Sequence, residues 1–311
     1  MSRVYYISNS DVQAYKNCRR DWWLGSVRNL IPNAPWTEDI MPGTQANKGS
    51  LVHLGLKTFY ETGDMDLAIA SIPEVLEYTV ENVTYRNEAY EKDRELAVIM
   101  LRGYVDWLAE TGADADIKIL GVEEEIAVDI SEWVGGGHTV ILVGKADIRM
   151  LDRAGARRIM DHKTVGAISS DTWPVREQLL TYCVIDRMLH PDAWVDGAFV
   201  NQLRKVKRTV QAKPPFYGRP PVQFNNEEFH SFWGNLLVIV REMVHIRELL
   251  DQGLTPVQAG IVPRPTSDCD WKCPFKDVCP MFDDGSRVED AIAVHFKKRE
   301  RSRYDTVPIT T

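Results

Sequence analysis

The order of apolar and polar positions along the chain predicts helices first, then strands, then helices again. Apolar residues at helical spacing follow residues 10–11, and a second helix is expected over residues 50–61. The pattern of residues 65–111 is helical almost throughout. Residues 117–130 and 139–150 alternate between apolar and polar positions, with a glycine-rich turn between them, as two strands do.

The second half of the chain continues with both types of element. Residues 157–163 predict a third strand, residues 172–189 a helix, residues 193–203 a further strand and residues 225–252 a long amphipathic helix. This order predicts a mixed α/β fold in which helices pack around one small sheet.

Composition narrows the classes of partner. The chain has 37 Lys and Arg against 45 Asp and Glu, a net charge of −8. This excludes a surface that is basic throughout, so a polyanion would need a local basic patch. No apolar run approaches the roughly 20 residues that span a bilayer, and the N-terminus lacks the apolar region of a signal peptide. We therefore expect a cytoplasmic protein without a membrane partner.

Two carboxylates and a lysine form the first candidate site. Adjacent strands of a hairpin can bring Asp147 and Asp161 side by side, with Lys163 on the same face as Asp161. Two close carboxylates repel unless a cation lies between them, and their hard oxygens suit Mg²⁺ or Mn²⁺. A nearby lysine can stabilise developing negative charge. Alternatively, both acids face solvent and Lys163 pairs with one of them; these residues alone favour neither interpretation.

Four short motifs follow one another in a fixed order. They are GSLVH at residues 49–53, GKAD at 144–147, DHK at 161–163 and QLLTY at 178–182. The chain thereby resembles the PD-(D/E)XK nuclease superfamily, and within it the RecB-like branch, which carries G-x-x-x-H, G-x-x-D, (D/E)-x-K and Q-x-x-x-Y in this order. The resemblance implies a restriction-endonuclease-like α/β core, a small mixed sheet flanked by helices, with a helical N-terminal insertion.

The resemblance also implies a role for individual residues. The metal ligands would be His53, Asp147 and Asp161, together with the backbone carbonyl of His162. The catalytic residues would be Asp147, Asp161, Lys163, Gln178 and Tyr182. The last two lie one helical turn apart and would hold the site together or touch the DNA backbone. One of the acids at 123–125 can approach the metal, but three consecutive acids cannot be assigned to a face.

Cysteines suggest a second metal centre. Cys269, Cys273 and Cys279 fall within eleven residues, whereas Cys18 lies near the N-terminus. Zinc sites usually pair two short cysteine or histidine units, and the second pair is missing, whereas iron–sulfur clusters need four thiolates and tolerate a remote one. This pattern resembles the RecB-like iron–sulfur nucleases, among them the CRISPR-associated exonucleases. The resemblance implies a 4Fe–4S cluster that joins the ends of the domain, with zinc as the alternative.

Local basic segments are the candidates for contact with nucleic acid. One is the pair Arg19 and Arg20 beside two tryptophans, and the other is RKVKR at residues 204–208. The candidate DNA-binding residues are Arg19, Arg20, Arg204, Lys205, Lys207 and Arg208. A solvated charged loop is the alternative for the second segment.

The boundaries follow from these assignments. We expect a single nuclease domain over residues 1–296, with a helical part at about 50–111, the catalytic core at about 112–205, and the long helix and cysteines at 225–282. Residues 297–311 are expected to form a charged, flexible tail.

Taken together, the motifs predict a DNA nuclease that depends on Mg²⁺ or Mn²⁺ and carries an iron–sulfur cluster. Resemblance favours an exonuclease acting on single-stranded or duplex ends in recombination, repair or replication, in bacteria or their phages, with recombination or replication proteins as partners. No Walker A sequence is present, so no helicase motor of that type is expected. The alternatives are a non-catalytic or partner-dependent DNA-binding iron–sulfur subunit and a zinc-stapled interaction protein.

Overall fold

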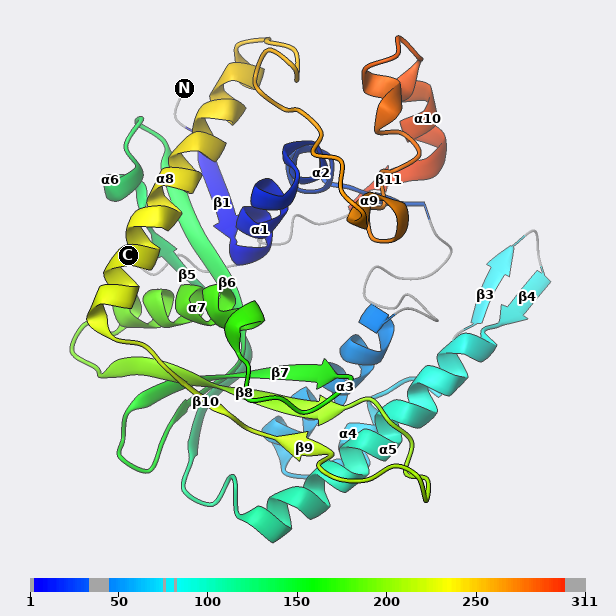
Figure 1. Ribbon diagram of the computed structural model, residues 1–311, viewed down its shortest axis with the longest axis vertical. Helices are drawn as coiled ribbons and strands as arrows, with labels where there is room; N and C mark the ends of the chain where they lie inside the picture. The colour runs from blue at the N-terminus through cyan, green and yellow to red at the C-terminus, as the bar shows by residue number, and fades with distance from the viewer. Residues whose placement is uncertain (1–2, 34–44, 75–76, 81–82, 300–311) are drawn as a thin grey trace. The chain divides into compact units, whose positions relative to one another are not determined.

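The computed structural model describes residues 3–33, 45–74, 77–80 and 83–299 of the chain (Figure 1). Its helices are α1 (Asn9–Asn17), α2 (Arg19–Trp22), α3 (Gln45–Thr62), α4 (Met65–Ala70), α5 (Glu88–Thr111), α6 (Ser131–Val134), α7 (Arg176–Leu189), α8 (Asn226–Asp251), α9 (Asp268–Trp271) and α10 (Val288–His295). Shorter helical turns are the π-helical η1 (Trp23–Val27) and the 3₁₀ turns η2 (Trp173–Val175) and η3 (Pro280–Phe282). Its strands are β1 (Val4–Ser8), β2 (Leu30–Pro32), β3 (Glu77–Val80), β4 (Val83–Arg86), β5 (Lys118–Asp129), β6 (Thr139–Leu151), β7 (Arg157–Val165), β8 (Val195–Arg204), β9 (Tyr217–Gly218), β10 (Pro221–Gln223) and β11 (Phe296–Lys298).

The chain divides into two compact units, each built from segments that are distant in sequence. Unit 1 comprises Met1–Ala34, Ile126–Gly144 and His230–Thr311. Unit 2 comprises Pro35–Glu125 and Lys145–Phe229. The expected boundary of one domain at residue 296 stays a prediction.

Unit 2 contains most of a mixed sheet. The second part of β6 pairs antiparallel with β7, β7 pairs parallel with β8, and β10 and β9 pair antiparallel with β8. The parallel pair requires a crossover connection, and α7 supplies it and packs on both strands. Consequently the carboxyl ends of β7 and β8 lie at the same edge of the sheet.

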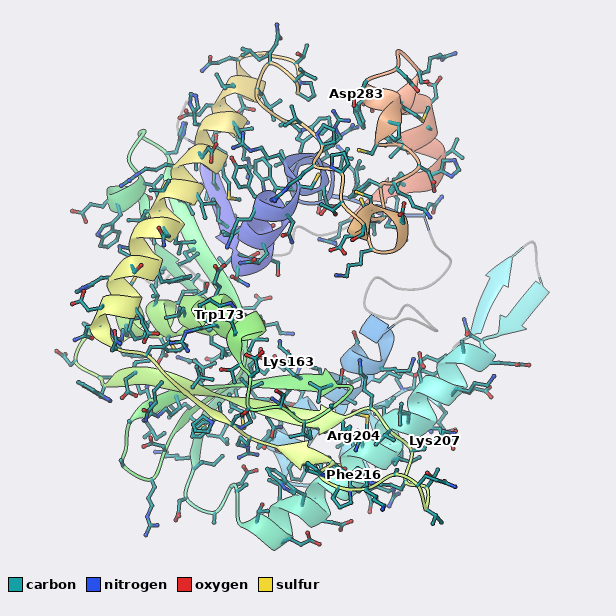
Figure 2. The ribbon with its side chains drawn as sticks, in the orientation of Figure 1. Lys163, Trp173, Arg204, Lys207, Phe216 and Asp283 are labelled. Atoms are coloured by element: carbon teal, nitrogen blue, oxygen red, sulfur yellow. The ribbon has the colours of Figure 1, made fainter. Side chains whose placement is uncertain are left out.

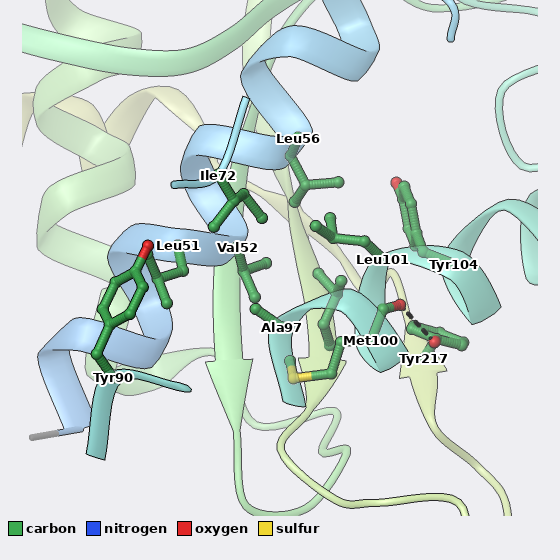
Figure 3. Packing of buried hydrophobic residues seen from close by; sticks show 11 residues of the cluster. Leu51, Val52, Leu56, Ile72, Tyr90, Ala97, Met100, Leu101, Tyr104 and Tyr217 are labelled. Atoms are coloured by element: carbon green, nitrogen blue, oxygen red, sulfur yellow. Dashed lines mark hydrogen bonds between the residues drawn. The ribbon is translucent and has the colours of Figure 1, made fainter. Parts of the chain in front are cut away.

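Helices α3 and α5 form the second layer of unit 2, and their contact requires a glycine. A Cβ at Gly55 would lie 2.4 Å from Leu101 Cδ1, so the two helices could not approach as closely with any larger residue. Figure 3 shows the apolar cluster between them, in which the Tyr217 hydroxyl also donates to the Met100 carbonyl at 2.6 Å. The buried members of this cluster are Leu51, Val52, Leu56, Ile72, Tyr90, Ala97, Met100, Leu101, Tyr104, Leu203 and Tyr217. The packing fixes α3 against its neighbours.

Unit 1 joins both ends of the described chain. Strand β1 runs parallel to the first part of β6, and α1 begins with a capping box formed by Ser8 and Asp11. Near the other end, β11 pairs antiparallel with β2, with Lys297 opposite Ile31 and Lys298 opposite Leu30. The expected tail therefore begins with residues that form a strand, and residues 300–311 lie outside the described part.

The expected fold class is confirmed: the structure is a mixed α/β fold with a mixed sheet flanked by helices. The strands expected at 117–130, 139–150, 157–163 and 193–203 are β5 to β8. The region expected to be helical at 65–111 instead contains the hairpin β3–β4 between α4 and α5. Within the described ranges, no helix is long and apolar enough to cross a bilayer.

Candidate active site

The site begins where the pairing of β6 and β7 ends. The last paired residues toward the site are Ile148 and Met160, so Asp147 and Asp161 stand next to each other one position beyond. There the carboxylate of Asp147 accepts the His162 amide at 2.6 Å. Both acids are buried, with 8% of Asp147 and 1% of Asp161 exposed. The expected juxtaposition of the two carboxylates is thus present in the structure.

His53 reaches the same point from α3. Its Nδ1 lies 3.4 Å from Asp147 Oδ1 and 3.6 Å from Glu123 Oε1. Its Nε2 is 2.9 Å from the His162 carbonyl, and because a carbonyl only accepts, Nε2 is the donor. The other ring nitrogen, Nδ1, therefore faces the carboxylates.

These contacts gather three residues that suit a divalent metal. Among the described residues, His53, Glu123 and Asp147 are the group whose ligand atoms all lie within 4.8 Å of one another. Oε1 of Glu123 is buried and accepts no hydrogen bond from any described residue, which leaves a lone pair for a ligand. One imidazole and two carboxylates fit a hard cation such as Mg²⁺ or Mn²⁺.

Sequence reasoning did not select Glu123 from the three acids, and the backbone explains why. Glu123 has a φ of 50°, in the left-handed region that residues other than glycine rarely adopt. This irregularity inside β5 turns one acid toward His53, which a regular alternation along the strand does not predict. Such a conformation is costly and is typical of functional positions. The run of acids at 123–125 was the only signal in the sequence.

The second part of the site is built around Lys163, which Figure 2 labels. Its Nζ lies 2.8 Å from Asp161 Oδ2 and donates to Gln178 Oε1 at 3.1 Å. The amide nitrogen of Gln178 in turn donates to the Tyr182 hydroxyl at 2.9 Å, one turn along α7. The structure therefore brings all the predicted catalytic side chains into one unit. Asp161, expected as a metal ligand, contacts the lysine and is not in the group of three.

The buried ionisable groups of the site have shifted pKa values, and the directions of the shifts differ. Burial raises the pKa of Asp161 to about 6, with Asp147 adding to this and Lys163 opposing it. Burial alone would lower the pKa of His53, but Asp147 and Glu123 raise it to about 10. Burial would raise the pKa of Asp147, yet the neighbouring His53 holds it below its usual range. The carboxylates thus attract a positive charge, which the proton on His53 supplies.

The four predicted iron–sulfur ligands are in unit 1. They line a cavity of about 750 Å³, and the cysteines around it are Cys18, Cys269, Cys273 and Cys279. All are free thiols. The amide of Arg264 donates to the Cys18 sulfur and that of Thr266 to the Cys269 sulfur, each at 3.4 Å. Four thiols around one cavity, with amides directed at two of them, have the donor set of a metal or iron–sulfur centre.

Arg20, which was expected to contact DNA, is buried instead. Only 2% of Arg20 is exposed, and its guanidinium pairs with both carboxylate oxygens of Asp283 at 2.7 and 2.9 Å. It also donates to the Cys279 carbonyl at 2.9 Å. The two tryptophans beside this pair, Trp22 and Trp23, are buried as well, so neither is free to stack on a base. Arg20 therefore ties α2 to the cysteine segment.

The side chain of Arg19 is partly exposed to solvent. It pairs with Glu242, and its guanidinium lies 5.0 Å from the centre of the Tyr15 ring. Because the side chain is about one third exposed, its contact with DNA stays a prediction.

Residues of the second basic segment, which follows β8, have partners within the chain. Lys207 pairs with Glu95 of α5, and Arg208 stacks on Phe216 at 3.5 Å and donates to the Tyr217 hydroxyl at 2.6 Å. Figure 2 labels Lys207 and Phe216 beside α5. These contacts fix the segment against the helix.

Two further basic residues lie in the same segment. Arg204 donates to the carbonyls of Gly166 and Lys213 at 3.3 and 2.9 Å. Partial burial and the nearby charge of Lys48 lower the pKa of Lys205. DNA binding by these residues stays a prediction.

One exposed aromatic residue near the site was not identified from the sequence. Trp173 is 77% exposed and lies in η2, directly before the helix that carries Gln178. Its backbone amide bonds to Asp171 at 3.0 Å, and the preceding loop is tied to β8 by two hydrogen bonds between Gln202 and the backbone of Ser169. A large exposed aromatic on a fixed loop is suited to stacking on a base.

Comparison with known proteins gives a match over most of the chain. The sequence model of the PD-(D/E)XK nuclease superfamily matches residues 6–280. No curated protein matches the sequence. Among solved structures, the protein named SSO0001 is 14% identical with a TM-score of 0.33, over 79% of this chain and 88% of that chain. A candidate exonuclease from Eubacterium rectale is 12% identical with a TM-score of 0.44, over 86% and 92%. Both scores are too low to bear on the chemistry of the site.

Proposed function

Since the chain belongs to the PD-(D/E)XK nuclease superfamily, and is therefore a nuclease with DNA as its substrate, we propose that it is a metal-dependent exonuclease that hydrolyses DNA from its ends. The convergence of His53, Glu123 and Asp147 beside the pair of Asp161 and Lys163 carries this proposal. The superfamily alone gives the class of enzyme, whereas the metal dependence rests on these side chains.

The residues of the site have separate roles. His53 through Nδ1, Glu123 and Asp147 would hold Mg²⁺ or Mn²⁺, and the bound ion supplies Lewis acidity toward the phosphate and a water of lowered pKa. The ammonium group of Lys163 would stabilise the negative charge that develops on the scissile phosphate. Asp161 and Gln178 hold this ammonium group from two sides, at 2.8 and 3.1 Å. Tyr182 fixes the orientation of the Gln178 amide.

Substrate contacts lie next to these residues. The basic segment at residues 204–208 follows β8, whose carboxyl end shares the edge of the sheet with Lys163. It supplies charge for the DNA backbone. Trp173 offers a surface for an unpaired base near the same edge. Both features support action on a single-stranded end. From the resemblance to the RecB-like branch alone, we also propose a role in recombination, repair or replication, with proteins of those processes as partners.

For the cysteines we propose a 4Fe–4S cluster, as in the RecB-like iron–sulfur branch that includes the CRISPR-associated exonucleases of bacteria and phages. The four thiols line one cavity, which supports a shared metal centre. Four thiolates, one of them remote in sequence, match the ligand set of a 4Fe–4S cluster. A single zinc ion held by the same thiolates is the alternative.

The proposal is tested by digestion of end-labelled DNA. Anaerobically purified protein is given Mg²⁺ or Mn²⁺ with linear single strands, linear duplex and closed single-stranded circles. The wild type should degrade linear DNA and spare circles, and Lys163→Ala should be at least about 100-fold slower because it lacks the stabilising charge. Lys57→Ala, an exposed lysine of α3 paired with Glu61, serves as the matched control and should keep full activity.

The other outcomes decide between the alternatives. If circles are cut as fast as linear strands, the enzyme is an endonuclease. If the wild type binds DNA and Mn²⁺ yet cuts nothing, a non-catalytic DNA-binding role replaces the proposal. Zinc in place of iron in the purified protein would contradict the cluster but leave the nuclease proposal intact.

A further inference from the structure

The backbone of His162 holds two of the three residues proposed as metal ligands. Its amide donates to Asp147 Oδ2 at 2.6 Å, and its carbonyl accepts from His53 Nε2 at 2.9 Å. Asp147 and His53 come from different elements, β6 and α3, so this one residue sets the position of one relative to the other. Whatever fixes His162 therefore also fixes the two ligands.

The imidazole of His162 is anchored deep in unit 2. It is 2% exposed, and its Nδ1 lies 2.9 Å from the side-chain nitrogen of Asn201. Asn201 is fully buried and is the partner of His162 in the parallel pairing of β7 and β8. On its face the ring stacks on Tyr60, with centroids 5.6 Å apart and planes at 18°.

A buried arginine determines the direction of these hydrogen bonds. Arg219 Nε lies 3.2 Å from Asn201 Oδ1, and a guanidinium can only donate. Asn201 must therefore accept with its oxygen and donate with its nitrogen, so Nδ1 of His162 accepts. An accepting ring nitrogen carries no proton, which places the ring proton of His162 on Nε2.

Arg219 itself is held on all sides. Its side chain is 8% exposed and pairs with Asp114. It also donates to the Tyr104 hydroxyl at 2.7 Å and the Tyr60 hydroxyl at 3.3 Å. Tyr60 lies on α3 two turns after His53, on the same face of the helix. Arg219 is thus connected to the metal site by two routes. One runs through Asn201, and the other runs through Tyr60 on the helix that carries His53.

We propose that Arg219 is a positioning residue for the metal centre, which acts through Asn201 and His162 on Asp147 and His53. The inference rests on the proposed function, because it takes these two residues as ligands. Arg219 touches neither the substrate nor the metal in this role. Its effect is to keep one tautomer and one orientation of His162, and so to keep the ligand atoms at the spacing that a cation needs.

The first test measures the affinity of the full chain for Mn²⁺ by electron paramagnetic resonance. Arg219→Met should weaken binding by about 10- to 100-fold, as loss of an outer-shell partner does. The matched control is Arg157→Met, because Arg157 is also a partly buried arginine of unit 2, paired with Asp186 at 2.7 Å. The control should lose thermal stability but keep the affinity for Mn²⁺.

The second test reads the tautomer of His162 and needs no metal. In the wild type labelled with ¹⁵N-histidine, the nuclear magnetic resonance shifts should show the proton on Nε2. Asn201→Asp keeps the shape of the side chain but replaces its donor by an acceptor, so Nδ1 of His162 must donate. This variant should move the proton to Nδ1 and weaken Mn²⁺ binding, even if Arg219→Met does not fold.

Several results would overturn the inference. They are an unchanged Mn²⁺ affinity in Arg219→Met and Asn201→Asp, an equal loss of affinity in Arg157→Met, or a ring proton on Nδ1 in the wild type. In each of these cases wild-type Mn²⁺ binding and DNA cleavage would still support the proposed function. A wild type that binds no Mn²⁺ would instead contradict the proposed metal site and this inference with it.

Discussion

At the scale of single residues, the site holds three carboxylates close together, and each has a cation beside it. Glu123 pairs with Lys145, Asp147 with protonated His53 and Asp161 with Lys163. The pKa of His53 is raised well above its usual value because Asp147 and Glu123 face the ring, and burial raises the pKa of Asp161. Both effects have the same cause, which is negative charge confined in a medium that solvates it poorly. A divalent ion relieves both, so the titration of these groups reports on metal binding.

The affinity for Mn²⁺ should rise with pH. A metal at His53 Nδ1 must displace the proton there, whose pKa is raised to about 10. Between pH 7 and pH 9 the apparent Kd should therefore fall by up to about tenfold per unit. Isothermal titration in buffers of differing ionisation enthalpy would also detect the released proton. A Kd that is independent of pH over this range, with no proton release, would contradict binding through His53.

Asp161→Asn should stabilise the metal-free protein at neutral pH. The pKa of Asp161 is raised from 3.8 to about 6 in the folded chain. The protonated carboxyl group therefore contributes to the free energy of unfolding below pH 4, and this contribution is lost as the pH rises through 6. Asparagine cannot ionise and removes this loss. In the presence of a chelator, Tm of the variant minus Tm of the wild type should be larger at pH 7.5 than at pH 4.5. An equal difference at both pH values would show that Asp161 ionises freely.

Trp173→Ala should weaken binding to single-stranded DNA. Stacking of one base on an aromatic side chain contributes about 1–3 kcal/mol, so Kd should rise by roughly 5- to 150-fold. Fluorescence anisotropy with a labelled oligonucleotide and the Lys163→Ala background, which prevents cleavage, would measure it. Trp194→Ala is the matched control because Trp194 is 66% exposed but stands before the first residue of β8, away from its carboxyl end. Equal losses in both variants would exclude a specific contact.

At the scale of elements, alternation of apolar and polar positions predicted β5 to β8 and so placed Asp147, Asp161 and Lys163 together. The ordered motifs added His53 and the pair on α7. What could not be predicted depends on departures from regular geometry. Glu123 joins the site through a left-handed backbone, and the hairpin β3–β4 interrupts a stretch whose composition suits a helix. Periodicity along one segment reports regular elements and does not predict such departures.

The contact between α3 and α5 provides a test at this scale. Gly55→Ala places a methyl group 2.4 Å from Leu101 Cδ1, which should cost about 1–3 kcal/mol of folding free energy. Because His53 lies half a turn before Gly55, Mn²⁺ affinity should also fall. Gly234→Ala on α8 has open space and should be neutral or stabilise by up to about 1 kcal/mol. Denaturant titration of both variants would show whether the helices tolerate a wider separation.

At the scale of the whole molecule, the two kinds of chemistry are segregated. All residues proposed for DNA hydrolysis belong to unit 2, and all four cysteines proposed for the cluster belong to unit 1. The sequence motifs indicated both centres but not this division, because the segments of the two units alternate along the chain. Burial of Arg20 illustrates the same point, since a basic pair beside tryptophans resembles a DNA contact until its partner Asp283 is known.

Cys273→Ala should lower iron content and thermal stability together. A cluster held by Cys18 and the C-terminal cysteines cross-links distant parts of unit 1, so its loss should lower Tm by several degrees. Cys183→Ala is the control, because Cys183 is fully buried in unit 2 and lies outside the cavity. It should leave iron content unchanged. Cys273→Ala with full iron content, or with an unchanged Tm after loss of iron, would contradict the cross-linking role.

The pairing of β11 with β2 has a consequence for the order in which the protein is completed during synthesis. Unit 2 contains no residue beyond Phe229, so every element around Lys163 is synthesised before α8 is complete. In unit 1, Leu30–Pro32 can form its strand pair only after Phe296–Lys298 has been synthesised. The side chains proposed for hydrolysis are therefore all synthesised before the cysteines at 269–279. Insertion of the proposed cluster would follow synthesis of unit 2, so a shortage of iron should affect unit 1 without preventing the folding of the hydrolytic unit.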